Sequence, residues 1–416
     1  MDKKEQLFNT DLSVIREGNT EIFIHKSDKN TTPSKSMAVF YNKKMEINRD
    51  ISNIAILAYN KLFNQSPLII VDPMAGSGVG SIRMLKECKN IKKIYINDIN
   101  PFAVEIIYKN LNLNEIKYDS DKLVVSKKDA IFLFSEISQN SKKSPENKHS
   151  KPNIISIDPF GTPNLYLDGA FKSIQKKDGL LCVTATDTAV LFGIKSKTCI
   201  RKYMSKPLRT EYSKEIGARI LVHFISRIAN VNKMGIIPIL TFYTSHFIRV
   251  FCLTFKNQNE IFKYFKGYGY IIHCNNCGYR ATFKANPLNI EKECPVCKNY
   301  SKMEYAGPLW INKIHDLKFV KKMIKINEKL KLKNNKRIDK LLNLIKEELD
   351  LPISYYNIHK LSKELKIPTI PKLETLINTI RKKGYCASRT HFDYLSIKTT
   401  MDLESLRGTL LELKIN

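Results

Sequence analysis

The residues best suited to chemistry lie in a glycine-rich turn, a series of aspartates, a DPFG turn and two pairs of cysteines. The first of these follows an apolar run in Leu68-Ile-Ile-Val-Asp72-Pro-Met-Ala-Gly76-Ser-Gly78-Val-Gly80, which predicts a strand, a turn and the start of a helix. Glycines let the backbone approach a ligand closely, and a helix N-terminus can receive the polar end of that ligand. Because Ser81 stands where G-x-G-x-x-G would end, a nicotinamide-binding loop fits only in part.

Three aspartates each close a predicted strand, where ligands of open α/β sheets bind. Asp72 would repel a pyrophosphate, and it suits the amino group of S-adenosylmethionine better. Asp98 is placed to accept hydrogen bonds from ribose hydroxyls, and Asp129 from the adenine amine with Ala130 packed beside the ring. One such Asp would be explained by capping of the next helix, but three in succession after Gly76 predict a cofactor site.

The fourth predicted strand ends in Ile157-Asp158-Pro159-Phe160-Gly161. This segment is similar to the Asp/Asn-Pro-Pro-aromatic turn of methyltransferases that modify exocyclic amines. An aryl amine is a poor nucleophile because its lone pair is delocalised, so an acceptor such as Asp158 would localise the lone pair and take the leaving proton. Phe160 would stack on the base. The alternative is an ordinary turn, since D-P-x-G is common in turns.

The cysteines indicate a metal site. Cys274, Cys277, Cys294 and Cys297 follow a C-x2-C-x16-C-x2-C spacing, which lies in the zinc-ribbon range. Four thiolates make a closed tetrahedral site, so we expect structural Zn²⁺, with unligated thiols or a redox pair as the weaker interpretations. The other cysteines are expected to fill the core: Cys88, Cys182, Cys199, Cys252 and Cys386.

The elements that position these residues alternate between strand and helix. Predicted strands cover residues 68–72, 93–98, 122–129, 153–158 and 180–185, with amphipathic stretches between them and a polar loop over 139–151. This alternation predicts an α/β fold with a doubly wound, Rossmann-like methyltransferase sheet.

The pattern changes after about residue 255. We therefore expect an S-adenosylmethionine-dependent methyltransferase domain over residues 1–255 and a C-terminal α+β domain over 256–416 that holds the zinc-ribbon-like site. A Lys-rich helix is expected over 316–350, and the helices and hairpin that follow resemble a winged-helix unit. Its basic residues would contact the phosphate backbone of a nucleic acid: Arg381, Lys382, Lys383, Arg389 and His391.

The composition agrees with a polyanionic partner. Lys and Arg number 69 against 40 Asp and Glu, a formal net charge of +29, although a Lys-rich genome would produce the same bias. The sequence contains no uninterrupted apolar run of about 18 residues, so we expect no membrane span. The start, MDKKEQLFNT, has no apolar signal region, so we expect a cytoplasmic protein, and we expect a monomer.

Longer blocks extend this interpretation. Segments in the same order over nearly the whole chain resemble the tRNA (guanine-26-N2)-dimethyltransferases: EGNTEIFIH, VFYNKKMEINRDIS, NDINPFAVEIIYKNLNLN, IDPFGTPNLYLDGA, GLLCVTATDTAVL, KPLRTEYSKEIGARIL, GPLW and RKKGYCASRTHF. The resemblance implies transfer of one or two methyl groups from S-adenosylmethionine to N2 of guanine 26 in tRNA. It also implies that the C-terminal domain over 256–416 binds the tRNA.

The resemblance also implies roles for residues. Arg49, Asp98, Asp129 and Ala130 fall on cofactor-binding positions, Asp158 on the catalytic position and Phe160 on the stacking position. This chain has Gly80 where the family often has Arg, and we consider Arg83 as the substitute contact; it also has Ser245 where the family more often has Asp. Two alternatives remain open at this point: an amino-methyltransferase that acts on DNA, which the TATDTAVL and KPLRTEY blocks disfavour, and a non-catalytic tRNA-binding protein that keeps the fold.

Overall fold

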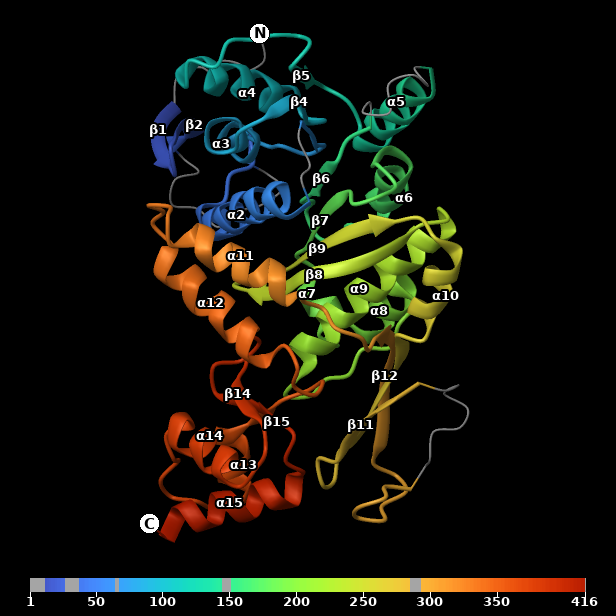
Figure 1. The fold of residues 1–416 in the computed structure, drawn as a ribbon, viewed down its shortest axis with the longest axis vertical. Helices are drawn as coiled ribbons and strands as arrows, with labels where there is room; N and C mark the ends of the chain where they lie inside the picture. Colours follow the sequence, from blue (N-terminus) through green and yellow to red (C-terminus); the bar gives the residue numbers. More distant parts are fainter. Residues whose placement is uncertain (1–11, 27–36, 64–66, 144–150, 285–292, 416) are drawn as a thin grey trace.

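The computed structural model describes residues 12–26, 37–63, 67–143, 151–284 and 293–415 (Figure 1). A seven-stranded sheet with strand order β5-β4-β3-β6-β7-β9-β8 forms its centre. The strands are β3 (Leu68–Asp72), β4 (Ile91–Asn97), β5 (Leu123–Ser126), β6 (Ile154–Ile157), β7 (Leu180–Ala185), β8 (Gly235–Thr244) and β9 (Phe247–Phe255). The first five are parallel, and β9 runs antiparallel to both of its neighbours. All five predicted strands are therefore confirmed, together with the doubly wound sheet.

Helices cover both faces of this sheet, and alternate strand residues explain why. Ile155 and Ile157 of β6 lie in one apolar core, whereas Ile154 lies in the other. The first core includes α5 (Ala130–Lys143), α6 (Asn164–Ser173) and α9 (Ser213–Val231). The second includes α2 (Glu46–Phe63), α3 (Val79–Glu87) and α4 (Pro101–Leu113). Because successive strand side chains point to opposite faces, a sheet that is apolar on both faces needs these two helical layers.

Shorter elements complete the first half of the chain. They are the hairpin β1 (Leu12–Glu17) and β2 (Thr20–His25), the 3-10 helix η2 (Lys43–Met45), α7 (Thr188–Leu191), α8 (Ser196–Tyr203) and α10 (Gln258–Phe265). Helix α5 continues to Lys143, so the polar-loop prediction is wrong for residues 139–143. Residues 144–150 of that loop lie outside the described ranges.

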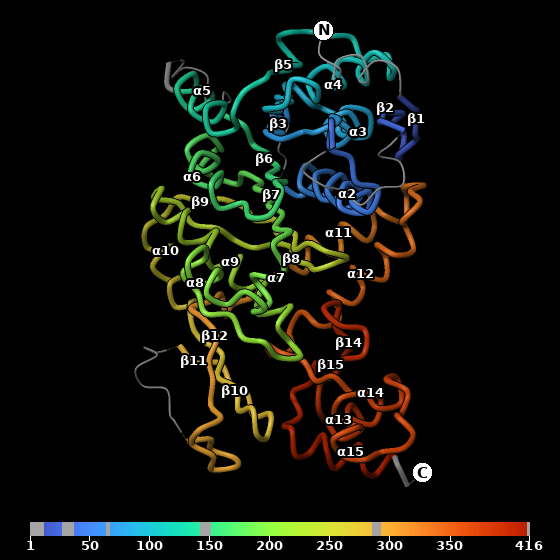
Figure 2. Tube along the Cα trace, turned by 180° about the vertical axis from the view of Figure 1, so that it is seen from behind, coloured from blue at the N-terminus to red at the C-terminus, as the bar shows by residue number. Residues whose placement is uncertain are grey.

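The second half contains two small sheets. One has the order β11-β10-β12 and carries the cysteine pairs, with β10 (Tyr268–Cys274), β11 (Arg280–Phe283) and β12 (Met303–Trp310). The other has the order β13-β15-β14, with β13 (Tyr356–Asn357), β14 (Ala387–Arg389) and β15 (Ser396–Thr399), and it packs with α13 (Ile358–Glu364), α14 (Leu373–Lys382) and α15 (Leu403–Ile415). This arrangement agrees with the expected winged-helix-like end, and both views place it beside the cysteine-bearing hairpin (Figures 1 and 2).

The predicted Lys-rich helix is in fact two helices, α11 (Leu317–Asn327) and α12 (Asn335–Glu348). Asn335 explains the break, because its side chain accepts a hydrogen bond from the Leu332 N–H (3.0 Å) and donates to the carbonyl oxygens of Asn327 and Leu330. Such local side-chain bonds compete with a continuous helix. Both helices pack with α2 in the second core, where Phe319, Val320 and Met323 are fully buried.

The proposed domain boundary at residue 255 stays a prediction. The packing shows that the two parts of the chain share apolar cores. Residues beyond 255 contribute to both cores of the central sheet, including Trp310 and Tyr355 on one face and Phe319 on the other. A chain cut at residue 255 would expose the apolar surface that these side chains cover. Within the described ranges, no helix is both long and apolar enough to span a bilayer.

Candidate active site and four-cysteine centre

A pocket opens where the carboxyl ends of β3 and β6 face α2. Four of the predicted site residues line it: Arg49, Asp72, Gly76 and Asp158. Strand β9 contributes Arg249 to the same wall, a residue that no sequence pattern had indicated. The structure therefore brings the glycine-rich turn and the DPFG turn into one space, as the parallel sheet requires.

The glycine-rich turn adopts a conformation that needs glycine. Gly76 has φ +56°, and a Cβ at this position would lie 2.9 Å from the carbonyl oxygen of Phe40. Asp98 fixes the turn, because its Oδ2 accepts a hydrogen bond from the Gly76 N–H at 2.8 Å. Its Oδ1 accepts from the Asn100 N–H at 3.0 Å. Asp98 thus stands next to the pocket and supports the backbone that forms its wall.

Asp129 and Ala130 lie outside the pocket lining. Asp129 is exposed and caps α5 by accepting a hydrogen bond from the Ile131 N–H at 2.7 Å, and Ala130 is buried behind it. Asn97, which the sequence did not single out, ties the strand ends together. Its fully buried side chain donates to the carbonyl oxygens of Pro73 (2.9 Å) and Lys128 (2.8 Å). The loops that carry Asp72 and Asp129 are therefore held by one amide.

Asp72 is buried without a cationic partner in the described part of the chain. It is 8% exposed, and the Ser81 hydroxyl donates to its Oδ2 at 2.7 Å. Burial raises the pKa of this carboxyl to about 7, and the nearby charges of Asp158 and Asp98 act in the same direction. A cation that enters the pocket would therefore stabilise the ionised form of this carboxylate, which burial disfavours.

Asp158 lies on the opposite wall in a similar environment. Its Oδ2 accepts a hydrogen bond from the Asn48 amide at 3.3 Å. Burial raises its pKa, whereas the charge of Arg249 and a hydrogen bond from Thr184 oppose that shift. Two residues along the chain, Phe160 is 46% exposed, and its ring meets Phe40 edge to face with centroids 4.3 Å apart. Phe40 lines the pocket, so an aromatic pair stands at its mouth.

The DPFG turn is held from behind by the segment after β7. The Gly161 N–H donates to Thr186 Oγ1 at 2.7 Å, and the Thr186 N–H donates back to the Gly161 carbonyl at 2.9 Å. Tyr203 bridges the two segments, since its hydroxyl lies 3.1 Å from Thr162 Oγ1 and donates to Asp187 Oδ1 at 2.8 Å. This geometry accounts for the TATDTAVL block as the support of the turn.

Arg49 faces the pocket, but its guanidinium is already paired. Nε and Nη2 each lie 2.6 Å from an oxygen of Glu17, at the end of β1. The two arginines Arg49 and Arg83 lower the pKa of Glu17 to about 2 against the effect of burial. Arg83, the expected substitute for a cofactor contact at Gly80, is fully buried in ion pairs with Glu17, Asp50 and Glu87. The expectation for Arg83 is therefore wrong, because three carboxylates hold it away from the pocket.

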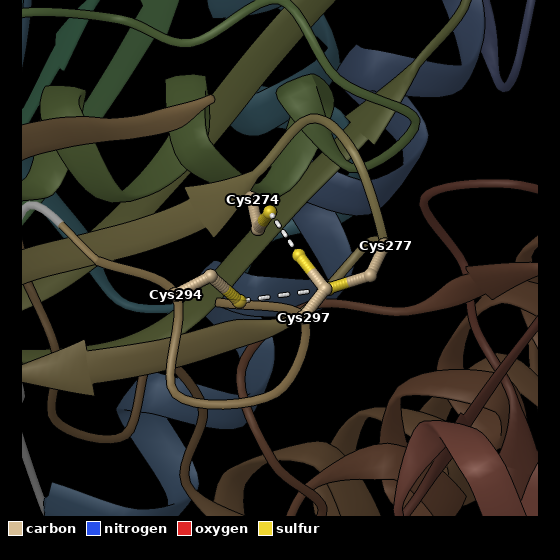
Figure 3. Close-up of side chains that lie close together, drawn as sticks. All are labelled: Cys274, Cys277, Cys294 and Cys297. Carbon is tan, nitrogen blue, oxygen red and sulfur yellow. Dashed lines mark hydrogen bonds between the residues drawn. The ribbon is translucent and has the colours of Figure 1, made fainter. Parts of the chain in front are cut away.

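The four predicted metal ligands come together (Figure 3). Their sulfur atoms all lie within 4.8 Å of one another, with Cys274 and Cys297 3.6 Å apart and Cys277 and Cys294 3.6 Å apart. Zn–S bonds of about 2.3 Å in a tetrahedron place the sulfurs about 3.8 Å apart, so the donor set fits Zn²⁺. Of the remaining cysteines four are buried as expected, but Cys386 is exposed, because it lies in the turn between α14 and β14.

The expected basic surface at the C-terminal end is only partly present. Arg381 and Lys382 are exposed, whereas His391 is buried and its Nδ1 hydrogen-bonds to Glu348. The prediction that His391 contacts RNA is therefore wrong, because this ring belongs to an internal cluster of charges. Lys383 is exposed, and its Nζ forms an ion pair of 2.6 Å with Glu412.

Comparison with known proteins agrees with this geometry. The family model for N2,N2-dimethylguanosine tRNA methyltransferases matches residues 18–410. The chain belongs to this family. A tRNA (guanine(26)-N(2))-dimethyltransferase of Methanosphaera stadtmanae is 36% identical over 97% of this chain and 98% of its own length. A tRNA (guanine(26)-N(2)/guanine(27)-N(2))-dimethyltransferase of Aquifex aeolicus is 31% identical over 97% of this chain and 96% of its own length.

A solved structure of the family supports the fold. It is the complex of Trm1 from Pyrococcus horikoshii with S-adenosyl-L-methionine, which has 31% sequence identity and a TM-score of 0.79 over 96% of this chain and 100% of the other. Membership of the family over nearly the full length confirms the sequence-based resemblance, and the DNA-directed alternative falls away.

Proposed function

We propose that the protein transfers methyl groups from S-adenosylmethionine to the exocyclic N2 of guanine 26 in tRNA, and does so twice to give the dimethylated base. The observation that carries this proposal is that Asp158 of the DPFG turn shares one pocket with the glycine-rich turn, in a chain that matches the dimethylguanosine family over residues 18–410.

The chemistry assigned to the chain follows from that pocket. S-adenosylmethionine supplies an electrophilic methyl group when it is bound. Asp158 accepts the N2–H of the guanine, which localises the nitrogen lone pair, and takes the proton as the new N–C bond forms and the S–C bond breaks. Phe160 and Phe40 stand at the pocket mouth, where they can hold the base plane in line with the transferred carbon.

The cofactor residues have separate tasks in this proposal. Asp72 binds the cofactor ammonium, since it is buried and lacks a cation of its own among the described residues. Gly76 lets the backbone approach closely, and Asp98 binds the ribose while supporting that turn. At the far end Asp129 and Ala130 receive the adenine. Arg49 contacts the cofactor from α2, and its ion pair with Glu17 holds the guanidinium in position for that contact.

The test is nucleoside mass spectrometry of an unmodified tRNA transcript after incubation with enzyme and cofactor. We expect N2-methylguanosine and then N2,N2-dimethylguanosine from position 26, and no product from a transcript with adenine at that position. An Asp158→Ala variant is the matched enzyme control. Methylation of a different base would refute the assignment.

We further propose that the cysteines bind one structural Zn²⁺ per chain and that residues 256–416 hold much of the tRNA surface, with the protein acting as a monomer. Elemental analysis of protein purified under reducing conditions without chelators should give about one zinc per chain. A Cys294→Ser variant should lose the metal and expose the hairpin to proteolysis. A zinc content near zero for the unaltered protein would count against the site, and sedimentation analysis would reveal a dimer.

A further inference from the structure

Arg249 of β9 has an unusual environment for a charged side chain. It is 1% exposed and lines the pocket. Its guanidinium donates to three hydroxyl oxygens: Thr184 Oγ1 at 2.5 Å, Ser156 Oγ at 3.0 Å and Ser52 Oγ at 3.2 Å. Within the described ranges it makes no ion pair, and its Nε has no hydrogen-bond partner. A buried cation is costly unless a charge balances it, so the fold itself gains little from this arginine.

The strand register places Arg249 close to the DPFG turn. Arg249 lies opposite Thr184 in the antiparallel pair of β9 and β7. In the parallel pair of β6 and β7, Ile157 is level with Val183, so Asp158 follows level with Thr184. Ser156 and Asp158 are two residues apart on one strand path and share a face. The guanidinium therefore reaches across β7 to the side of β6 that presents Asp158.

Helix α2 contacts both Arg249 and Asp158. Ser52 accepts from Arg249, and Asn48, one helical turn earlier, donates to Asp158. Thr184 lies between them by strand register, and its hydroxyl offers two acceptor sites and one donor. Its oxygen accepts from Arg249, and a hydrogen bond from it lowers the pKa of Asp158.

We infer that Arg249 is a positioning residue for methyl transfer: its guanidinium is the counter-charge of the Asp158 carboxylate and, through the Thr184 hydroxyl, fixes the direction in which that carboxylate points. The inference rests on the function proposed above. It assigns the methyl-transfer pocket a cation that stabilises the proton acceptor.

The other ionisable groups of the pocket do not replace Arg249. Arg49 from α2 also favours the ionised form of Asp158, but both of its hydrogen-bonding nitrogens are occupied by Glu17. On the β3 side Asp72 carries the same sign of charge as Asp158, and so does Asp98 after β4. Tyr41 has its hydroxyl bonded to Glu17. Among these groups Arg249 has the largest effect in favour of ionised Asp158.

The experiment compares the pH dependence of single-turnover methyl transfer for the full-length protein and three variants, with saturating cofactor and tRNA. Arg249→Met removes the charge, Arg249→Lys keeps it, and Thr184→Val removes the hydroxyl link. We expect the rate of Arg249→Met to begin falling at a higher pH than that of the unaltered protein and to recover as the pH rises, because each unit by which the pKa of Asp158 increases lowers the rate about tenfold on the acidic side. Thr184→Val should move in the same direction by less, and Arg249→Lys should keep the profile of the unaltered protein.

Controls separate the possible failures. Cofactor affinity, measured by titration, should change by less than about threefold in all three variants, and thermal unfolding reports any loss of stability. A lower rate with an unchanged pH profile in Arg249→Met would overturn the inference and leave a purely structural role. If Arg249→Met does not fold, an unchanged pH profile in Thr184→Val would also overturn the inference. Absence of methyl transfer by the unaltered protein would instead reject the proposed function.

Discussion

Two clusters of buried carboxylates in this protein have opposite electrostatics. In the pocket, burial raises the pKa of Asp72, Asp98 and Asp158. In a second cluster, between the central sheet and the winged-helix-like end, nearby cations lower the pKa of Glu215 and hold that of Glu348 at about 2, although both are fully buried. Burial is therefore common to both clusters, and the difference lies in what neutralises the charge.

The second cluster, which we call the hub, consists of Glu215, Arg219, Glu348, His391 and Lys398. Lys398 lies between the acids, 2.8 Å from Glu215 and 3.7 Å from Glu348. Arg219 adds an ion pair of 3.0 Å to Glu215, and Thr390 donates to Glu348 at 2.5 Å. These residues come from α9, α12, β15 and the turn before it, so the hub joins the parts of the molecule.

The contrast shows how a structural charge differs from a functional one. Each carboxylate of the hub has a cation supplied by the chain, so it is satisfied in the folded protein. The pocket carboxylates Asp72 and Asp158 form no ion pair with a Lys or Arg of the described residues. The charge nearest in effect to Asp158 is the guanidinium of Arg249, which is hydrogen-bonded to hydroxyl groups. A pocket in this state can stabilise a cationic cofactor and accept a proton, whereas the hub can only hold the fold.

The largest effect is expected at Asp158. Asp158→Ala should lower the single-turnover rate of methyl transfer by a factor on the order of 10²–10⁴, the usual contribution of general acid–base catalysis. Thermal unfolding is measured in parallel, because the variant also leaves the buried guanidinium of Arg249 without the carboxylate that balances it. Near-full turnover in rapid-quench assays would mean that the Pro159 carbonyl suffices as the acceptor.

The corresponding change in the hub should act on stability instead. Lys398→Met leaves Glu215 and Glu348 with too little positive charge, and breaking a buried pair in this way costs about 3–5 kcal/mol. Denaturant titration measures the loss, and cofactor affinity of the folded protein should be unchanged. Lys383→Met is the matched control, since its partner Glu412 is on the surface and such pairs contribute at most about 1 kcal/mol. Equal effects of the two variants would refute the contrast.

A third prediction uses pH. Burial raises the pKa of Asp72 in the folded protein to about 7, well above its value in an unfolded chain. The folded protein without cofactor therefore binds the extra proton, and its stability falls as the pH rises from about 4 through 7. Binding of the cofactor ammonium needs the ionised form, so affinity should increase about tenfold between pH 6 and pH 8. Calorimetric titration measures this, and Asp72→Asn should bind weakly with a flat profile. A flat profile for the unaltered protein would remove Asp72 from the ammonium site.

The smallest effect is expected for cations outside both clusters. Lys382 is exposed on α14, and Lys382→Gln should weaken tRNA binding modestly and reduce the magnitude of the log–log salt slope by about one. Filter-binding titrations over a range of salt concentrations measure the slope. Charge changes at Arg381 are less informative, because its guanidinium donates to the Ala387 carbonyl at 3.0 and 2.8 Å. An unchanged slope would place the RNA surface elsewhere.

The sequence by itself determined the features that rest on local patterns. Strands β3 and β7 could be predicted to the residue, and the glycine-rich turn, the DPFG turn and the spacing of four cysteines each indicated their chemistry. These signals are readable because turn geometry, strand period and metal-ligand spacing depend on residues close together in the chain. Only the helix over 316–350 failed among the long elements, because Asn335 forms side-chain bonds that a helical period does not reveal.

The tertiary structure alone decided which charges are satisfied. Arg249 bonds to Ser52 across 197 positions, and Lys398 pairs with Glu215 across 183. No sequence pattern predicts either contact. An ion pair or a hydrogen bond between distant segments forms only where the fold brings the two side chains together. The same reason explains His391, which the sequence placed on an RNA-binding surface and the fold places against Glu348. Residue types therefore predicted the reacting groups, and packing assigned each buried charge to the pocket or to the hub.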